Sequence, residues 1–304
     1  MHLQTCVDDR STVRRITMGA AGIASPCFIF DLRASSMAFH TLMKRTIIDL
    51  SVTLEDKPTS PAHHRPQIDY VNHDESWELF GKLLPGVTRE HMPEGKAWAV
   101  ERVSLSTHAG THMDAPWHYH PTTDHALTPS GRPSPGIDEV PLDWCMQPGV
   151  KLDFRHFDAG YVVTPQDIEA ELRRIGHELR PLDIVVANTR AGARYGQPDY
   201  WESACGFGRA ATLWLLERGV RVVGTDSYSW DAAFKYVVER FKQTQDASII
   251  WEGHKAGRDI GYFQMEKLTN LDQLPATGFT ICCFPIKIKH GSAGWCRTVA
   301  VLES

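Results

Sequence analysis

Residues 108–118 read HAGTHMDAPWH and place three histidines and one aspartate within eleven positions. The spacing from His108 through His112 and Asp114 to His118 is His-x3-His-x-Asp-x3-His. Imidazole nitrogens and carboxylate oxygens are ligands that zinc, manganese and iron accept. Four such side chains this close together can converge on one point. We interpret the cluster as a metal site. The alternative interpretation is that these histidines have ordinary surface or core partners.

The residues around the cluster indicate how it is positioned. Gly110 and Pro116 argue against a helix, so His108 and His112 are not expected on one helical face. The stretch WAVERVSLST at 98–107 alternates in polarity and predicts a half-buried strand that leads into the cluster. We therefore expect a tight loop at the end of a strand, with the glycine allowing a sharp turn between the first two ligands.

The remaining pattern predicts a mixed α/β domain in which strands outnumber helices. A helix is expected over 164–176, with Thr164 as its cap, Pro165 at its first position and Gly176 at its end. Further helices are expected over 208–219 and 230–242, and strands over 44–54, 149–154, 183–189, 220–226, 247–251, 261–268, 278–288 and 295–302. One domain is expected over 44–304, preceded by a poorly ordered extension over 1–43.

Composition limits the classes of function. The chain has 304 residues, 42% of them hydrophobic and 23% charged, with a formal net charge of −5. These values favour a globular protein and give no support for a nucleic-acid or membrane partner. Seven cysteines without C-x-x-C spacing favour reduced thiols in the cytoplasm. The alternative is export, because Arg14-Arg15 precede an apolar stretch in the manner of a twin-arginine signal. Met37 or Met43 could also be the functional start.

The segment HAGTHMDAPWH resembles the H-x-G-T-H-x-D-x-P-x-H signature of the metal-dependent cyclase family, which includes bacterial kynurenine formamidases and isatin hydrolases. The segments TIIDLSV (46–52), GTDSYSWD (224–231) and LTNLDQLPATGF (268–279) are also similar to that family. The resemblance implies a mixed sheet or barrel-like core flanked by helices, the swivelling β/β/α-type cyclase fold. It also implies homodimers or homotetramers, with neighbouring subunits contributing to the pocket.

The resemblance further implies a second pair of metal ligands, a histidine and a glutamate twelve residues apart. His254 and Glu266 have this spacing. The implied site holds one or two divalent ions, zinc or manganese, with Asp114 shared between them. His108 and His112 would complete the first position, and His254 and Glu266 the second. His118 would act as general acid and base, or as an extra ligand of a single ion.

The implied activity is hydrolysis of a small cyclic or aryl amide by metal-activated water, with His118 carrying the proton. Two alternatives are a metal-dependent lactone hydrolase or cyclase, and a non-catalytic metal-binding or ligand-sensing protein. Substrate-binding candidates are Trp117, Trp77 and Phe80. Supporting residues are expected at the end of the strand over 220–226, namely Asp226, Ser227 and Tyr228.

Overall fold

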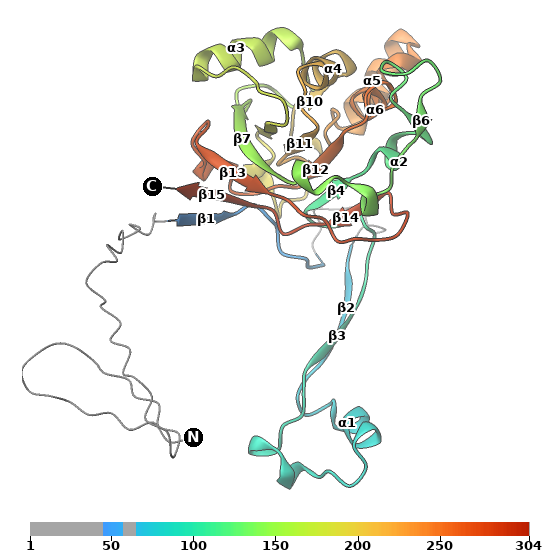
Figure 1. Ribbon diagram of the computed structural model, residues 1–304, viewed down its shortest axis with the longest axis vertical. Coiled ribbons are helices and arrows are strands. Elements are labelled where there is room, and N and C mark those ends of the chain that lie inside the picture. The colour runs from blue at the N-terminus through green and yellow to red at the C-terminus, as the bar shows by residue number, and fades with distance from the viewer. Residues whose placement is uncertain (1–44, 57–64, 304) are drawn as a thin grey trace, which may run out of the picture. The chain divides into compact units, whose positions relative to one another are not determined.

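The computed structural model describes residues 45–56 and 65–303. The expected extension over 1–43, including Arg14-Arg15, therefore lies outside the described residues. A mixed sheet of nine strands dominates the structure, in the order β1-β15-β13-β7-β9-β11-β12-β4-β14 (Figure 1). The strands are β1 (Arg45–Asp49), β4 (His112–Asp114), β7 (Met146–Asp153), β9 (Ile184–Asn188), β11 (Val222–Thr225), β12 (Phe263–Glu266), β13 (Phe279–Cys282), β14 (Ala293–Trp295) and β15 (Val299–Glu303).

The middle of this sheet is parallel and its flanks are antiparallel. β7, β9, β11 and β12 run parallel to one another, whereas β4 and β14 on one side and β13, β15 and β1 on the other pair antiparallel. Successive side chains of β9 enter two different cores: Val185 and Ala187 join one, and Ile184 and Val186 join the other. Both faces of the sheet are therefore covered, as parallel strands require.

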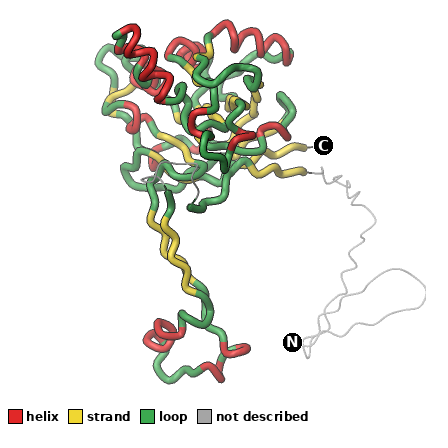
Figure 2. Tube along the Cα trace, turned by 180° about the vertical axis from the view of Figure 1, so that it is seen from behind, coloured by secondary structure: helices red, strands yellow, loops and turns green. Residues whose placement is uncertain are grey.

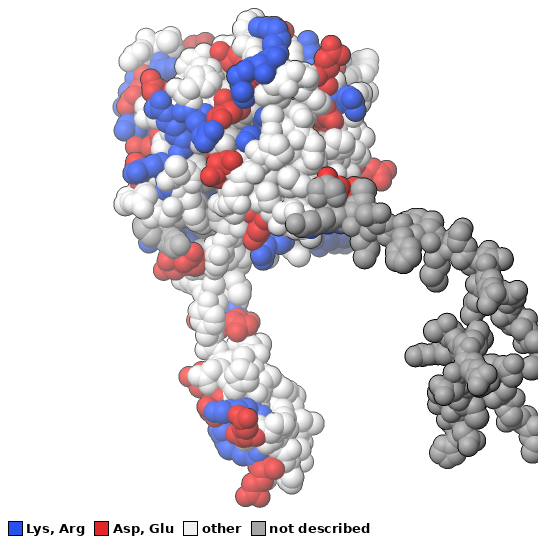
Figure 3. Space-filling model, turned by 90° about the vertical axis from the view of Figure 1, so that its left-hand side faces the viewer, with Lys and Arg blue, Asp and Glu red and all other residues white. Residues whose placement is uncertain are grey.

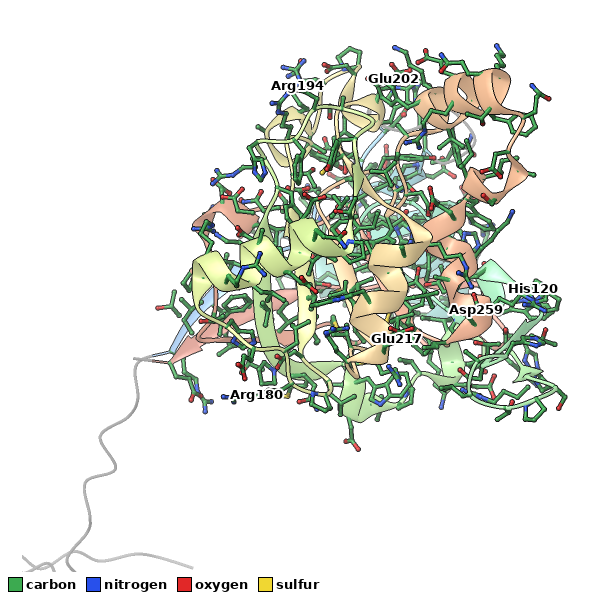
Figure 4. All side chains as sticks on the ribbon, turned by 90° about the horizontal axis from the view of Figure 1, so that it is seen from above. His120, Arg180, Arg194, Glu202, Glu217 and Asp259 are labelled. Atoms are coloured by element: carbon green, nitrogen blue, oxygen red, sulfur yellow. The ribbon has the colours of Figure 1, made fainter. Side chains whose placement is uncertain are left out.

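Helices cover one face of the sheet. They are α2 (Pro116–Tyr119), α3 (Pro165–Ile175), α4 (Arg209–Glu217), α5 (Phe234–Thr244) and α6 (Glu252–Asp259). Figure 4 shows Asp259 at the end of α6, where its carboxylate accepts a hydrogen bond from Arg209 of α4 at 2.6 Å. Ile137 and Leu271 pack into the core on the other face. Short pairs form between β8 (Val162–Val163) and β10 (Gly206–Phe207), and between β5 (Thr122–Thr123) and β6 (Arg132–Pro133).

Residues 67–104 form a separate antiparallel ribbon, which we call the hairpin arm (Figure 2). It consists of β2 (Gln67–Val71), β3 (Val100–Ser104) and, between them, helix α1 (Trp77–Leu83). The strand predicted over 98–107 is thus present, but the expectation that it is half-buried is wrong, because all five residues of β3 are exposed.

The other predicted helices and strands agree with the structure in part. The helix over 164–176 is confirmed with its cap, because Thr164 accepts from the Asp167 amide and Gly176 ends the helix with φ of 67°. The strand expected over 247–251 is wrong: Asp246 caps a short 3-10 helix there, at Ala247–Ile249. The helix expected from 230 begins only at Phe234, while Trp230 is fully buried. Helix α6 was not predicted.

The surface carries charges of both signs. Lys and Arg side chains share the face in Figure 3 with Asp and Glu side chains. Among the described residues, every helix is too short or too polar to cross a membrane.

Candidate metal centre

The centre is built on two neighbouring strands, β4 and β12. Their antiparallel register sets Gln264 opposite Asp114 and Glu266 opposite His112. Directly opposed residues share one face of a sheet, so these four polar side chains lie together, and all four are buried. The intervening Met113 and Met265 point into the core on the other face. The alternation of a strand therefore separates the ligands from the core.

A turn before β4 brings His108 back to this face. Gly110 has φ of +60°, and a side chain there would meet Leu54, with its Cβ only 2.4 Å from Leu54 Cδ2. After this turn, His108 Nδ1 lies 2.9 Å from Asp114 Oδ1. The predicted loop is present at 108–111. The expectation that His112 and Asp114 also belong to it is wrong, because both lie in β4.

His112 presents Nε2 to the centre. Its Nδ1 donates to the Gly110 carbonyl at 2.9 Å, which leaves Nε2 directed at the carboxylates. That atom faces Asp114 Oδ1 at 3.3 Å and Glu266 Oε2 at 3.6 Å. His112 Nε2 and Asp114 Oδ1 are buried without a hydrogen-bond partner among the described residues. Buried polar atoms are rarely left unsatisfied, and a divalent cation would satisfy both. The residues therefore fit a metal ion.

His118 reaches the centre from α2, a single helical turn that Pro116 begins. Its ring lies 4.2 Å from the His108 ring and 5.1 Å from the Trp251 ring, measured between centroids. Burial lowers the pKa of His118 to about 3 despite the nearby Asp114 carboxylate. The imidazole is therefore neutral at physiological pH. Trp251 was not anticipated from the sequence, although it directly precedes the helix that carries His254.

His254 enters from α6 and is held by Asp231. The Asp231 carboxylate pairs with His254 Nδ1 and accepts from the backbone amides of Gly253 and His254 at 2.7 and 3.1 Å. His254 Nε2 lies 3.7 Å from Asp114 Oδ2 and 3.6 Å from Glu266 Oε1. The structure thus brings the distant pair, His254 and Glu266, to the cluster at 108–118. Asp231 belongs to GTDSYSWD, so the similar segment was the available signal for it.

The charges of the centre are mutually dependent. Burial disfavours ionisation of Asp114, but the neighbouring imidazoles of His112, His108 and His254 hold its pKa well below the usual value. Burial and the Asp114 charge raise the pKa of Glu266. Burial also opposes protonation of His254, yet the Asp231 and Asp114 carboxylates raise its pKa to about 10. The centre is thus an ion-paired cluster of carboxylates and imidazoles.

Lys267 adds a buried cation to the centre. It is almost fully buried and has a left-handed backbone, with φ of +58°. Its Nζ donates to the His108 carbonyl at 2.6 Å and lies 4.6 Å from the Tyr228 ring centroid. Among the expected supporting residues, Tyr228 contacts the centre in this way. Asp226 instead accepts hydrogen bonds from Thr189, and Ser227 accepts from the Lys267 amide.

The substrate-binding candidates separate into two groups. Trp117 adjoins His118 and is 48% exposed, so it is not a core residue. Trp77 and Phe80 belong to the hairpin arm, where they pack on each other with ring centroids 4.9 Å apart and Phe80 also packs on Trp98. The structure therefore groups them with the arm, and their role at the centre stays a prediction.

Known proteins share this architecture and sequence pattern. The family model described as "Putative cyclase" matches residues 48–232. A kynurenine formamidase from Erythrobacter litoralis is 27% identical over 239 residues, which cover 73% of this chain and 92% of the relative.

Solved structures agree in fold. An isatin hydrolase bound to the product analogue thioisatinate matches with a TM-score of 0.64 at 20% identity, covering 86% of this chain and 93% of its own. Isatin hydrolase A from Ralstonia solanacearum matches with a TM-score of 0.64 at 22% identity, covering 85% and 92%. The family model spans more than half of the chain and includes the whole cluster at 108–118. The protein therefore belongs to the cyclase family.

Proposed function

We propose that this protein is a metal-dependent hydrolase that cleaves a non-peptide C–N bond in a small cyclic or aryl amide. The observation that carries the proposal is the pair of buried, unsatisfied atoms, His112 Nε2 and Asp114 Oδ1, beside His108. The similar kynurenine formamidase and isatin hydrolases support the amide as substrate class.

A divalent ion, when bound, polarises a carbonyl and lowers the pKa of water. His108, His112 and Asp114 would hold it, with Glu266 Oε2 within 3.6 Å of His112 Nε2. Neutral His118 is positioned to take the proton of the attacking water and to return it to the leaving nitrogen. Exposed Trp117 beside it would contact the ring of the substrate. Zinc and manganese both suit this mixed N/O set.

We place the enzyme in the cytoplasm as a homodimer or homotetramer, acting on a small molecule. The described cysteines form no disulfide, which supports the compartment, and the exposed apolar side chains of the hairpin arm support association. Export through a twin-arginine-like N-terminus is the alternative compartment. A lactone hydrolase or cyclase would use the same centre, and a ligand-sensing protein would bind the ion without turnover.

Two single substitutions, one of them a control, test the hypothesis that the protein is an enzyme. Metal-loaded protein is assayed against isatins, formyl-anilides, cyclic imides and lactones by absorbance. We expect His118→Ala to lower kcat by about 10²–10⁴-fold, because it removes the proton carrier, while metal content per chain is retained. His120→Ala is the matched control, since the His120 ring is bonded to Thr122, and it should keep wild-type turnover. A metal-loaded wild type that is inactive on the whole panel would favour the sensing protein.

A further inference from the structure

Gln264 lies where a second metal ion would have to bind. Its Nε2 is 2.8 Å from Glu266 Oε1, 2.9 Å from His254 Nε2 and 3.4 Å from Asp114 Oδ2. These are the three residues that the resemblance assigns to the second ion. The side chain is fully buried, and its Oε1 accepts from the Tyr262 hydroxyl at 2.9 Å. The amide is thus held with its nitrogen among the three atoms.

The distance to Glu266 Oε1 is that of an N–H donor to an acceptor. The amide nitrogen donates one of its two hydrogens to this oxygen and lies 2.9 Å from His254 Nε2. A metal ion would have to lie about 2.0–2.2 Å from the same atoms. An ion and the amide nitrogen therefore cannot occupy this position together. The neutral Gln264 amide thus lies beside the ligand atoms that would otherwise surround a second cation.

Lys267 supplies positive charge to the centre as a whole. Its buried ammonium follows Glu266 directly and is anchored on the His108 carbonyl at 2.6 Å. The buried carboxylates of Asp114 and Glu266 thus already have a fixed cation beside them, which reduces the charge that further cations would neutralise. At the other position, in contrast, His112 Nε2 and Asp114 Oδ1 have no hydrogen-bond partner among the described residues.

We propose that the centre binds one divalent ion per chain, at His108, His112 and Asp114, and that the Gln264 amide excludes a second. This inference rests on the proposed function and selects one of its two possible ion counts. His254 lies against the amide: Asp231 fixes its Nδ1, and its Nε2 is 2.9 Å from Gln264 Nε2. Glu266 accepts from Gln264 through Oε1, while its Oε2 remains directed at His112.

Metal stoichiometry tests the proposal without reference to activity. The full chain is loaded with Mn²⁺ or, separately, Zn²⁺, freed of excess metal, and measured for ions per chain by plasma mass spectrometry. We expect one ion in the wild type. Gln264→Glu replaces the donor with an anionic acceptor and should raise the content to two. The same substitution at Gln147, whose amide bonds to the Asp143 carbonyl away from these strands, should leave it at one.

A failure of this inference can be distinguished from a failure of the proposed function. Two ions in the wild type would overturn this inference and leave the proposed hydrolase intact. A wild type that retains no ion would overturn both. If Gln264→Leu lost the single ion, the amide would be a ligand and the exclusion would be wrong; we expect this variant to keep it. If Gln264→Glu failed to fold, the number of ions per chain in the wild type and in Gln264→Leu would still test the proposal.

Discussion

At the scale of single residues, Asp226 is a buried carboxyl that the proposed chemistry does not use. Both of its oxygens accept hydrogen bonds from Thr189, yet burial raises its pKa to about 7 from 3.8. Between these two values the folded protein holds a proton that the unfolded chain has lost. The stabilisation that the protonated Asp226 carboxyl gives the folded protein is therefore complete below about pH 4. It is lost as the pH rises through about 7.

We expect Asp226→Asn to remove this pH dependence. The free energy of unfolding of the wild type relative to the variant should fall between about pH 4 and pH 8 by up to about 4 kcal/mol. Urea denaturation followed by circular dichroism at several pH values measures the difference. Asp143→Asn, a substitution at an exposed position, is the control. Curves for wild type and Asp226→Asn that stay parallel over this range would refute the assignment.

The sequence predicted the local part of the site and missed the part that depends on register. His108, His112, Asp114 and His118 lie within eleven residues, so their spacing alone indicated a common site. Gln264 gave no such signal, because a glutamine inside an apolar strand is ambiguous. Only the pairing of β12 with β4 sets it opposite Asp114. Its position two residues before Glu266, on the same face of the strand, was the available clue.

At the scale of elements, helix α6 shows why a functional helix can escape prediction. Its short sequence EGHKAGRD contains two glycines, and its only apolar side chain is Ala256, which argues against a helix. The glycines serve packing instead: a Cβ at Gly257 would lie 2.3 Å from the Tyr119 ring. Helix α3 was predictable, in contrast, because its capping box and its terminal glycine are encoded in neighbouring residues.

We expect Gly257→Ala to destabilise the protein by about 1–3 kcal/mol, because the added methyl overpacks the contact between α6 and Tyr119. His254 lies on the same short helix, so metal-loaded activity should fall as well. The matched control is Gly81→Ala in α1, where a Cβ meets nothing within 4 Å. That variant should be neutral or more stable by about 0.5–1 kcal/mol. Thermal unfolding of both variants measures the contrast, and equal effects would contradict the packing account.

At the scale of the whole molecule, the apolar composition of the hairpin arm favours a role in association. Apolar side chains are exposed on both of its strands and on α1, including Tyr70, Val103 and Leu83. An isolated two-stranded hairpin is only marginally stable in water. The small cluster of Trp77, Phe80 and Trp98 closes its far end but leaves these strands uncovered. A second copy of the chain would supply the missing cover.

Removal of the arm should therefore change association and leave the main sheet intact. Asp69 pairs with Arg102 across the ribbon, so residues 70–101 can be replaced by a two-residue Asn-Gly turn. We expect the shortened protein to be a monomer by light scattering, and the full chain to be a dimer or tetramer. Its circular dichroism and its metal content should stay unchanged, because the strands of the centre lie outside the arm. A full-length monomer, or a shortened protein that still associates, would show that the arm does not join the subunits.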